Sequence, residues 1–266
     1  MNIFIRNIAV IVSLLPLFIT NSNADLIAKD DFEAGTWGSF WGSLANTTVS
    51  PILSKDGSYA ARFQYPGVAI TEDGWAEARF DLGGYYEQLS IRFDLYVPLN
   101  YEHRDSGSGN NNKFFRLWNE TYNDLEKIGA TTYNESTSGE SGIGSDYRLA
   151  SSWGMSSSVK KASDFITTAD KGNWVSIVIY IKAATDSKPA ELRIYKNGRL
   201  HLEDKLNINY VPGTQGYRHG YLLGWSNSGF TQETIFYIDN VEFHDNDIMS
   251  ATPSTPSWED PANPVK

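Results

Sequence analysis

Hydrophobic and polar residues alternate along most of this 266-residue chain, in short runs separated by breaks rich in glycine, serine and asparagine. A period of two, combined with β-branched and aromatic residues, is typical of β-strands that bury one face. The clearest predicted strands are Ala60–Gln64, Trp75–Leu82, Leu89–Val97, Lys113–Trp118, Trp174–Lys182, Glu191–Lys196, His219–Trp225 and Thr234–Phe243. Without any long amphipathic helix beside them, these strands predict an all-β fold, a two-sheet antiparallel β-sandwich.

The breaks between the strands are of two kinds. Asn197-Gly198 lies between Glu191–Lys196 and Arg199–Glu203 and is typical of a tight hairpin turn with positive φ. Residues 100–112 and 129–165 are much longer, polar and rich in small residues, and the first contains His103 and Arg104. Long loops of this kind are usually binding loops or lids, and tolerated surface insertions are the alternative.

The two ends of the chain differ from the rest. Residues 1–24 combine one charge, Arg6, with an apolar run and the small residues Ser22-Asn23-Ala24, which is typical of a secretory signal peptide. The apolar run is too short for a membrane anchor. Residues 247–266 are rich in proline and lack periodicity, so we expect a disordered tail. The prediction is a single domain over residues 25–246, secreted or periplasmic.

Charge and cysteine content narrow the class of function. The net charge is −10, and removal of residues 1–24 would make it about −11. An acidic exported chain is a poor partner for nucleic acid or an anionic membrane, although a local basic cleft can still bind a polyanion. The absence of cysteine excludes disulfides, thiolate chemistry and cysteine-bound metals.

Alternation divides each predicted strand into a core face and an outward face. In Trp75–Leu82 the outward residues are Trp75, Glu77, Arg79 and Asp81. In Lys113–Trp118 the pattern places Phe114, Arg116 and Trp118 on one face and Lys113, Phe115 and Leu117 on the other. Aromatic rings stack on sugars and arginine pairs with carboxylates, so such outward faces favour binding of a saccharide.

The segment GYRHGYLLGW, residues 216–225, carries the most distinctive side chains. One face would hold Tyr217, His219, Tyr221 and Trp225, which combines proton-transfer groups with flat apolar surfaces. An aromatic sandwich core is the alternative interpretation, although a core rarely contains a histidine beside two tyrosine hydroxyls.

A family resemblance covers most of residues 29–244. The segments DDFEAG, GSYAARF, WAEARFDLG, NKFFRLW, GNWVSIVIYIK, ELRIYKNGRL, GYRHGYLLGW and FYIDNVEF follow one another in the chain. In this order they resemble the concanavalin A-like jelly-roll polysaccharide lyases, the group of alginate lyases and heparin-lyase-I-like proteins. The resemblance implies a jelly roll with a concave groove that binds an acidic, uronate-containing polysaccharide and cleaves it by β-elimination.

This reaction needs a group that neutralises the uronate carboxylate, a base and an acid. The chain departs from the family pattern at Trp75, where an arginine is usual, and at Leu222, where the catalytic tyrosine is usual. We therefore expect Arg116, with Arg79, to neutralise the carboxylate, His219 or a tyrosine to be the base, and Tyr217 or Tyr221 to be the acid. The predicted substrate-binding residues are Glu77, Arg79, Trp118, Arg218, Trp225, His103, Arg104 and Lys113.

Two other functions remain open at this stage. A glycoside hydrolase on the same fold would need two carboxylates, and Glu77 with Asp94 or Asp81 is the grouping available. A non-catalytic carbohydrate-binding module or lectin would account for the aromatic residues alone. In every case we expect a monomer that acts on a saccharide, with no nucleic-acid or membrane partner.

The resemblance also implies a structural calcium ion where the first and last strands meet. Glu33, the carbonyl of Gly57 and Asp239 could supply the oxygen ligands that calcium prefers. The alternative is that Asp239 only hydrogen-bonds a turn. No cofactor is expected for catalysis.

Overall fold

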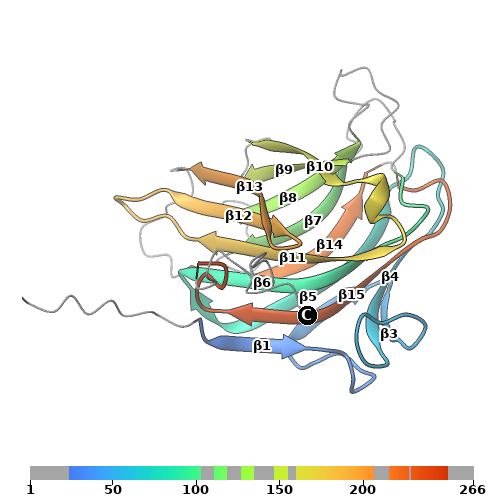
Figure 1. Ribbon diagram of the computed structural model, residues 1–266, viewed down its shortest axis with the longest axis horizontal. Coiled ribbons are helices and arrows are strands. Elements are labelled where there is room, and N and C mark those ends of the chain that lie inside the picture. Colours follow the sequence, from blue (N-terminus) through green and yellow to red (C-terminus); the bar gives the residue numbers. More distant parts are fainter. Residues whose placement is uncertain are drawn as a thin grey trace, which may run out of the picture.

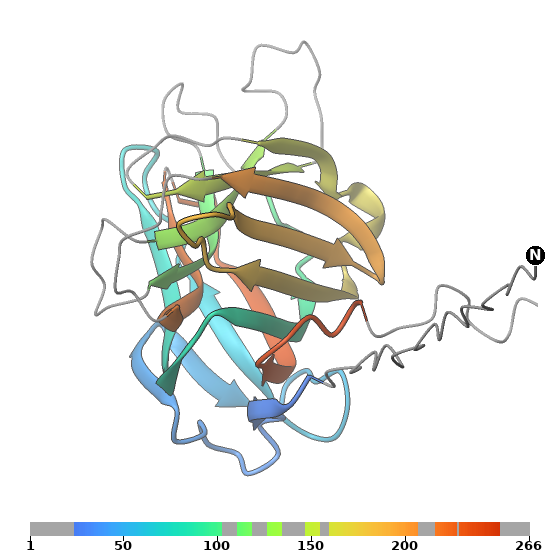
Figure 2. The same cartoon turned by 90° about the vertical axis from the view of Figure 1, so that its left-hand side faces the viewer.

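The strands pack as two antiparallel sheets in the computed structural model, which describes residues 24–102, 111–118, 127–134, 147–154, 160–206, 216–227 and 229–250 (Figures 1 and 2). Sheet A runs in the order β13 (Arg199–Leu206), β12 (Ala190–Lys196), β11 (Asn173–Lys182), β6 (Gln88–Val97), β15 (Thr234–His244), β4 (Ala60–Tyr65) and β3 (Thr47–Ser50), and β1 (Leu26–Asp30) also pairs with β15. Sheet B runs in the order β10 (Lys161–Ile166), β9 (Tyr147–Trp153), β8 (Lys127–Asn134), β7 (Asn111–Trp118), β14 (Tyr217–Ser226), β5 (Gly74–Tyr86) and β2 (Trp41–Ala45). The predicted all-β sandwich is confirmed.

The core lies between the facing sides of the two sheets. Sheet A contributes rows such as Ile91, Phe93 and Leu95 of β6, and sheet B contributes Ala76, Ala78 and Phe80 of β5. Burial of a large apolar side chain stabilises a fold by about 2 kcal/mol relative to exposure. These rows follow the predicted alternation, and the opposite side chains of both sheets therefore point away from the core.

Most predicted strands agree with the structure to within a few residues, and the hairpin turn is confirmed by positive φ angles at Asn197 (48°) and Gly198 (77°). The prediction of a long loop over residues 129–165 is wrong, because this stretch contains most of β8, all of β9 and most of β10. Small and polar residues such as Gly129, Thr131 and Ser151 interrupt the apolar alternation of these strands, so their propensity signal is weak. Hydrogen bonding in the sheet fixes them instead, since β8 pairs with β7, β9 with β8 and β10 with β9.

Only a small part of the predicted signal peptide and tail lies within the described residues. Residues 1–23 and 251–266, which hold most of the predicted signal peptide and tail, lie outside the described residues. Residues 247–250 are described, and the buried Asp247 forms an ion pair with Arg193 at 2.9 Å between Oδ2 and Nη1. This ion pair joins residue 247 to β12, and the predicted domain bounds stay a prediction.

Helix is rare in the described part of the chain. A short 3₁₀ turn covers Thr168–Asp170 between β10 and β11. None of the helical segments described there has the length and apolar character needed to cross a membrane.

Candidate functional site

The outward face of sheet B gathers most of the predicted site residues around the middle of β14. Tyr221 is paired with Arg79 of β5 on one side and with Arg116 of β7 on the other. Two residues earlier in β14, His219 is paired with Asp81 of β5 and with Trp118 of β7. We call this group, with Glu77 and Lys113, the sheet-B site. Its members come from three adjacent strands, which fixes their spacing.

Tyr221 lies at the centre of the sheet-B site. Its ring packs against Trp118 with 5.4 Å between ring centroids, and its hydroxyl is hydrogen-bonded by Arg116. Burial raises the pKa of Tyr221 well above its ordinary value, and the charge of Glu77 acts in the same direction. The hydroxyl is therefore neutral at physiological pH and can donate a proton, while Arg116 can stabilise the phenolate that is left.

A glycine on β8 makes room for the Arg116 side chain. Gly129 is the register partner of Arg116, and a Cβ at Gly129 would lie 2.9 Å from the Arg116 Cγ and 2.5 Å from the Phe115 carbonyl oxygen. No side chain fits there without a shift of the β7 backbone. Gly129 thus allows Arg116 to lie across the sheet towards Tyr221.

Glu77 and Arg79 form the β5 side of the site. Glu77 is buried, and its Oε1 accepts a hydrogen bond from the Arg79 Nε in a charged pair. Its Oε2 is buried and has no hydrogen-bond partner among the described residues. A buried carboxylate oxygen without a partner is costly to keep and is often found at functional sites, which marks Glu77 as a candidate functional residue.

A β-bulge in β14 shapes the middle of the site. Leu223 and Gly224 have positive φ angles of 56° and 136°, and the pairing with β7 shifts between Leu222 and Ser226. Both Leu222 and Leu223 consequently lie in the core. A Cβ at Gly224 would lie 2.8 Å from the Tyr221 Cε2 and 3.4 Å from the Glu77 Oε2, so the site has no room for a larger residue there.

Tyr65 holds this bulge from the other sheet. Its buried hydroxyl donates to the Gly224 carbonyl oxygen at 2.8 Å and accepts from the Gly224 N–H at 3.2 Å, and it also lies 3.0 Å from the Ala76 carbonyl oxygen of β5. A tyrosine of β4 thereby crosses the core and ties β14 to β5 beneath the site. The backbone under Tyr221 is rigidly supported.

A second bulge brings Lys113 into the site. The β7–β8 pairing shifts between Lys113 and Phe115, and both Phe114 and Phe115 lie in the core. The prediction that Phe114 shares the outward face with Arg116 is therefore wrong, because the extra residue reverses the alternation. Lys113 lies instead on the same side as Arg116.

The environment of Lys113 makes it a candidate base. Burial, and then repulsion by Arg116, lowers its pKa from 10.5 to about 8, and its Nζ donates to the Asn227 Oδ1 at 2.9 Å. Lowered lysine pKa values of this kind occur at catalytic sites. Sequence reasoning assigned Lys113 to substrate binding alone. The Phe114-Phe115 doublet was the signal that it could have used.

His219 is held by charged neighbours on the same face. Its Nδ1 lies 3.7 Å from the Asp81 Oδ2, and Asp81 accepts two hydrogen bonds from Arg218, at 2.7 and 2.9 Å. The Arg218 hydrogen bonds hold the pKa of Asp81 at about 2, and burial lowers the pKa of His219. His219 is thus neutral at physiological pH, whereas Arg218 is already engaged with Asp81.

Two tryptophans form a platform at one end of the site. Trp225 and Trp75 stack in parallel, 5.1 Å between centroids with 7° between the planes, and their exposed fractions are 42% and 36%. The rings are exposed despite their size, so they offer apolar surface to a ligand. Trp75, where the family pattern has an arginine, contributes half of this platform.

Other predicted site residues lie elsewhere. Tyr217 is buried in the hydrophobic core cluster, at a register shift between β14 and β5, and does not join the face of Tyr221. His103 and Arg104 lie outside the described residues. Asp94 belongs to β6, so it lies on the outward face of sheet A, separated from Glu77 by the core.

The residues expected to bind calcium are engaged with backbone amides. The Glu33 carboxylate accepts hydrogen bonds from the N–H groups of Ser58 and Tyr59, and the Asp239 carboxylate accepts from those of Lys55, Asp56 and Asn240. No group of three or more metal-binding side chains occurs among the described residues. The arrangement accounts for both carboxylates without a metal ion, and calcium binding stays a prediction.

Comparison with known proteins gives a match at the level of structure. No model of a protein family and no curated protein sequence matches the chain. The alginate lyase Aly36B in complex with an alginate tetrasaccharide matches with a TM-score of 0.54 and 11% identity, over 77% of this chain and 85% of that one. The endo-β-1,4-glucuronan lyase of the fungus Trichoderma reesei matches with a TM-score of 0.53 and 13% identity, over 83% and 95%. The chain has the jelly-roll β-sandwich fold of these lyases. A further match with that fold is the cellulose induced protein Cip1, with a TM-score of 0.52 and 10% identity, over 82% of this chain and 97% of that one.

Proposed function

We propose that this protein is an exported polysaccharide lyase that cleaves a uronate-containing polymer by β-elimination at the sheet-B site. The observation that carries the proposal is the grouping of a neutral Tyr221 hydroxyl, the Arg116 guanidinium bonded to it and the Lys113 amine with its lowered pKa. These three groups correspond to the acid, the neutraliser and the base that the reaction requires. The shared fold of alginate and glucuronan lyases supports the substrate class.

The elimination can be written with these groups. Arg116 pairs with the uronate carboxylate and thereby acidifies the adjacent C–H. The neutral amine of Lys113 takes that proton, the electron pair forms the carbon–carbon double bond, and the bond to the leaving oxygen breaks. Tyr221 donates its proton to that oxygen, and the Lys113 ammonium then returns a proton to the phenolate. His219 is the alternative base, since it is neutral and lies on the same face.

The carboxylates do not suit glycoside hydrolysis. Glu77 and Asp94 lie on opposite faces of the sandwich. Glu77 and Asp81 lie four residues apart on β5, which is about 13 Å along a strand and exceeds the separation used by either hydrolase mechanism. Asp81 is also paired with Arg218.

A non-catalytic binding module is the second candidate, and the exposed Trp75–Trp225 platform favours it. One experiment separates the two. The intact protein is mixed with alginate, glucuronan, pectate and glycosaminoglycans, and the ultraviolet absorbance of unsaturated uronate is followed. A lyase gives this signal with at least one polymer, whereas a binding module gives binding without it.

The variant Tyr221→Phe should reduce the signal by about 10²-fold or more, as loss of an acid–base group does. Tyr96→Phe is the matched control, because Tyr96 lies on the outward side of β6 in sheet A. Absence of the signal with every polyanion, or full activity of Tyr221→Phe, would contradict the proposal.

A further inference from the structure

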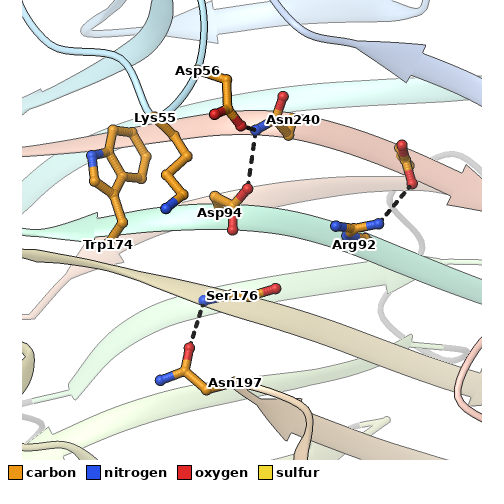
Figure 3. Close-up of a pocket in the computed structure, with 9 residues that line it drawn as sticks. Lys55, Asp56, Arg92, Asp94, Trp174, Ser176, Asn197 and Asn240 are labelled. Carbon is orange, nitrogen blue, oxygen red and sulfur yellow. Dashed lines mark hydrogen bonds and ion pairs between the residues drawn. The ribbon is translucent and has the colours of Figure 1, made fainter. Parts of the chain in front are cut away.

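The outward face of sheet A has a hollow of its own, of about 470 Å³, on the opposite side of the sandwich from the sheet-B site (Figure 3). It lies over β6, β11 and β15 and is bordered by the loop that contains Lys55 and Asp56. Its size is within the range of small-ligand sites. The lyase proposal makes no use of it.

A β-bulge in β15 builds this hollow. The pairing with β6 shifts between Asp239 and Glu242, and Asn240 has a φ of 52°. The buried Asp239 carboxylate accepts the Lys55 N–H at 2.8 Å and so fixes the loop beside the bulge. Asp239 of β15 thereby fixes the position of the loop that contains Lys55 and Asp56.

Asn240 arranges two carboxylates at the floor of the hollow. Its Nδ2 donates to the Asp56 Oδ2 at 2.8 Å and to the Asp94 Oδ2 at 3.0 Å (Figure 3). Asp94 is only 8% exposed. One amide group therefore holds both acids in place, and the second oxygen of each carboxylate remains a potential acceptor for a ligand.

Donor groups and an aromatic ring face these acceptors. Figure 3 shows the Lys55 side chain between Trp174 and Asp94. Within the described residues, the Lys55 ammonium, the Trp174 indole N–H and the Asn197 side-chain N–H groups have no hydrogen-bond or ion-pair partner. The hollow thus offers both hydrogen-bond donors and carboxylate acceptors beside the half-buried Trp174 ring.

Charge indicates the class of ligand. Lys55 and Arg92 contribute two positive charges to the lining, and Asp56, Asp94 and Glu242 contribute three negative charges. Such a lining has no excess of cations for a polyanion, in contrast to the sheet-B site with Lys113 and Arg116. Hydroxyl groups that both donate and accept, on a ring with an apolar face, match it best.

We propose that this hollow is a second saccharide site, which binds a neutral sugar residue against Trp174 through Lys55, Asp94 and Asn197. It would hold the protein on a neutral glycan while the opposite face remains open. The proposal is independent of the lyase reaction, because no sheet-B residue takes part in it.

The test uses calorimetric titration of the intact protein with cellohexaose, mannohexaose and laminarihexaose. We expect at least one to bind with a Kd below about 1 mM, typical of a single weak sugar site. Trp174→Ala should weaken binding at least tenfold, while Trp225→Ala, the matched change on sheet B, should leave it unchanged. The isosteric variant Asp94→Asn should also weaken binding, and its unfolding temperature shows whether the fold is kept.

Four outcomes would overturn the proposal: no binding of any of the three, binding that Trp174→Ala and Asp94→Asn leave intact, binding that Trp225→Ala removes, or a hollow that takes only a divalent cation or a uronate oligomer. The lyase signal should be the same in Trp174→Ala and in the unchanged protein. Failure of this proposal is therefore distinguishable from failure of the proposed function.

Discussion

Replacement of Lys113 by alanine should remove most of the lyase activity and change its dependence on pH. The reaction needs the neutral amine, and the pKa of Lys113 is about 8 because burial and Arg116 both disfavour the ammonium form. Activity of the unchanged protein should therefore rise with pH, with its midpoint near the pKa of Lys113, and level off above it.

The size of the effect follows from that pKa. With a pKa of about 8, roughly a tenth of Lys113 is neutral at pH 7, compared with about one in three thousand for a lysine at the ordinary 10.5. The site thus enriches the reactive form about 300-fold. Loss of a general base typically reduces the rate by about 10²- to 10⁴-fold, and this is the range we expect for Lys113→Ala.

The assay is the initial rate of unsaturated-uronate formation against pH, measured at polymer concentrations well below KM, so that it reports the pKa of the free protein. Lys205→Ala is the matched control, because Lys205 is exposed on the edge strand of sheet A and pairs only loosely with Glu203. A small amine added to Lys113→Ala should restore part of the rate. If the rising limb lies below pH 6.5 and persists in Lys113→Ala, the base is His219, and the assignment of Lys113 is wrong.

Three further predictions concern stability and packing. Lys113→Met should be more stable than the unchanged protein at pH 7 in denaturant titration. The pKa of Lys113 is lower in the folded protein than the ordinary 10.5, so the buried ammonium disfavours the folded state, in full below about pH 8. Equal or lower stability of the variant would contradict this. Gly224→Ala should lose activity out of proportion to stability, since the new Cβ would lie 2.8 Å from the Tyr221 ring, whereas Gly42→Ala meets only an ordinary contact at 3.8 Å and should remain active. Asp239→Ala should lower the free energy of unfolding by about 2 to 4 kcal/mol, because three backbone N–H groups lose their acceptor, and a loss below 1 kcal/mol would show that water replaces it.

Local alternation was enough to predict much of the fold and part of the site. The two-residue period assigned Ala76, Ala78 and Phe80 to the core and Glu77 and Arg79 to the outward face, and the structure agrees. The same reasoning placed His219 and Tyr221 on one face. These assignments depend only on neighbours in the chain, which is why they could be made from sequence.

The errors occur where the residue count changes or where distant strands meet. The doublets Phe114-Phe115 and Leu222-Leu223 each mark a bulge, and the bulge at Phe114-Phe115 places Lys113 on the face of Arg116, against the predicted alternation. Alternation also cannot tell which sheet a strand joins. Asp94 therefore looked like a partner for Glu77, although the core separates the two residues.

The bulge in β7 also explains how an acidic protein could bind and cleave an acidic polymer. With a net charge of −10, the chain as a whole repels a polyanion. The bulge in β7 nevertheless places Lys113 beside Arg116, where burial and then the charge of Arg116 disfavour the ammonium form of Lys113. A uronate carboxylate bound by Arg116 would cancel part of that repulsion, and the amine would become a stronger base once substrate is present. The arrangement that destabilises the resting protein is thus the one that would bind the substrate and activate the base.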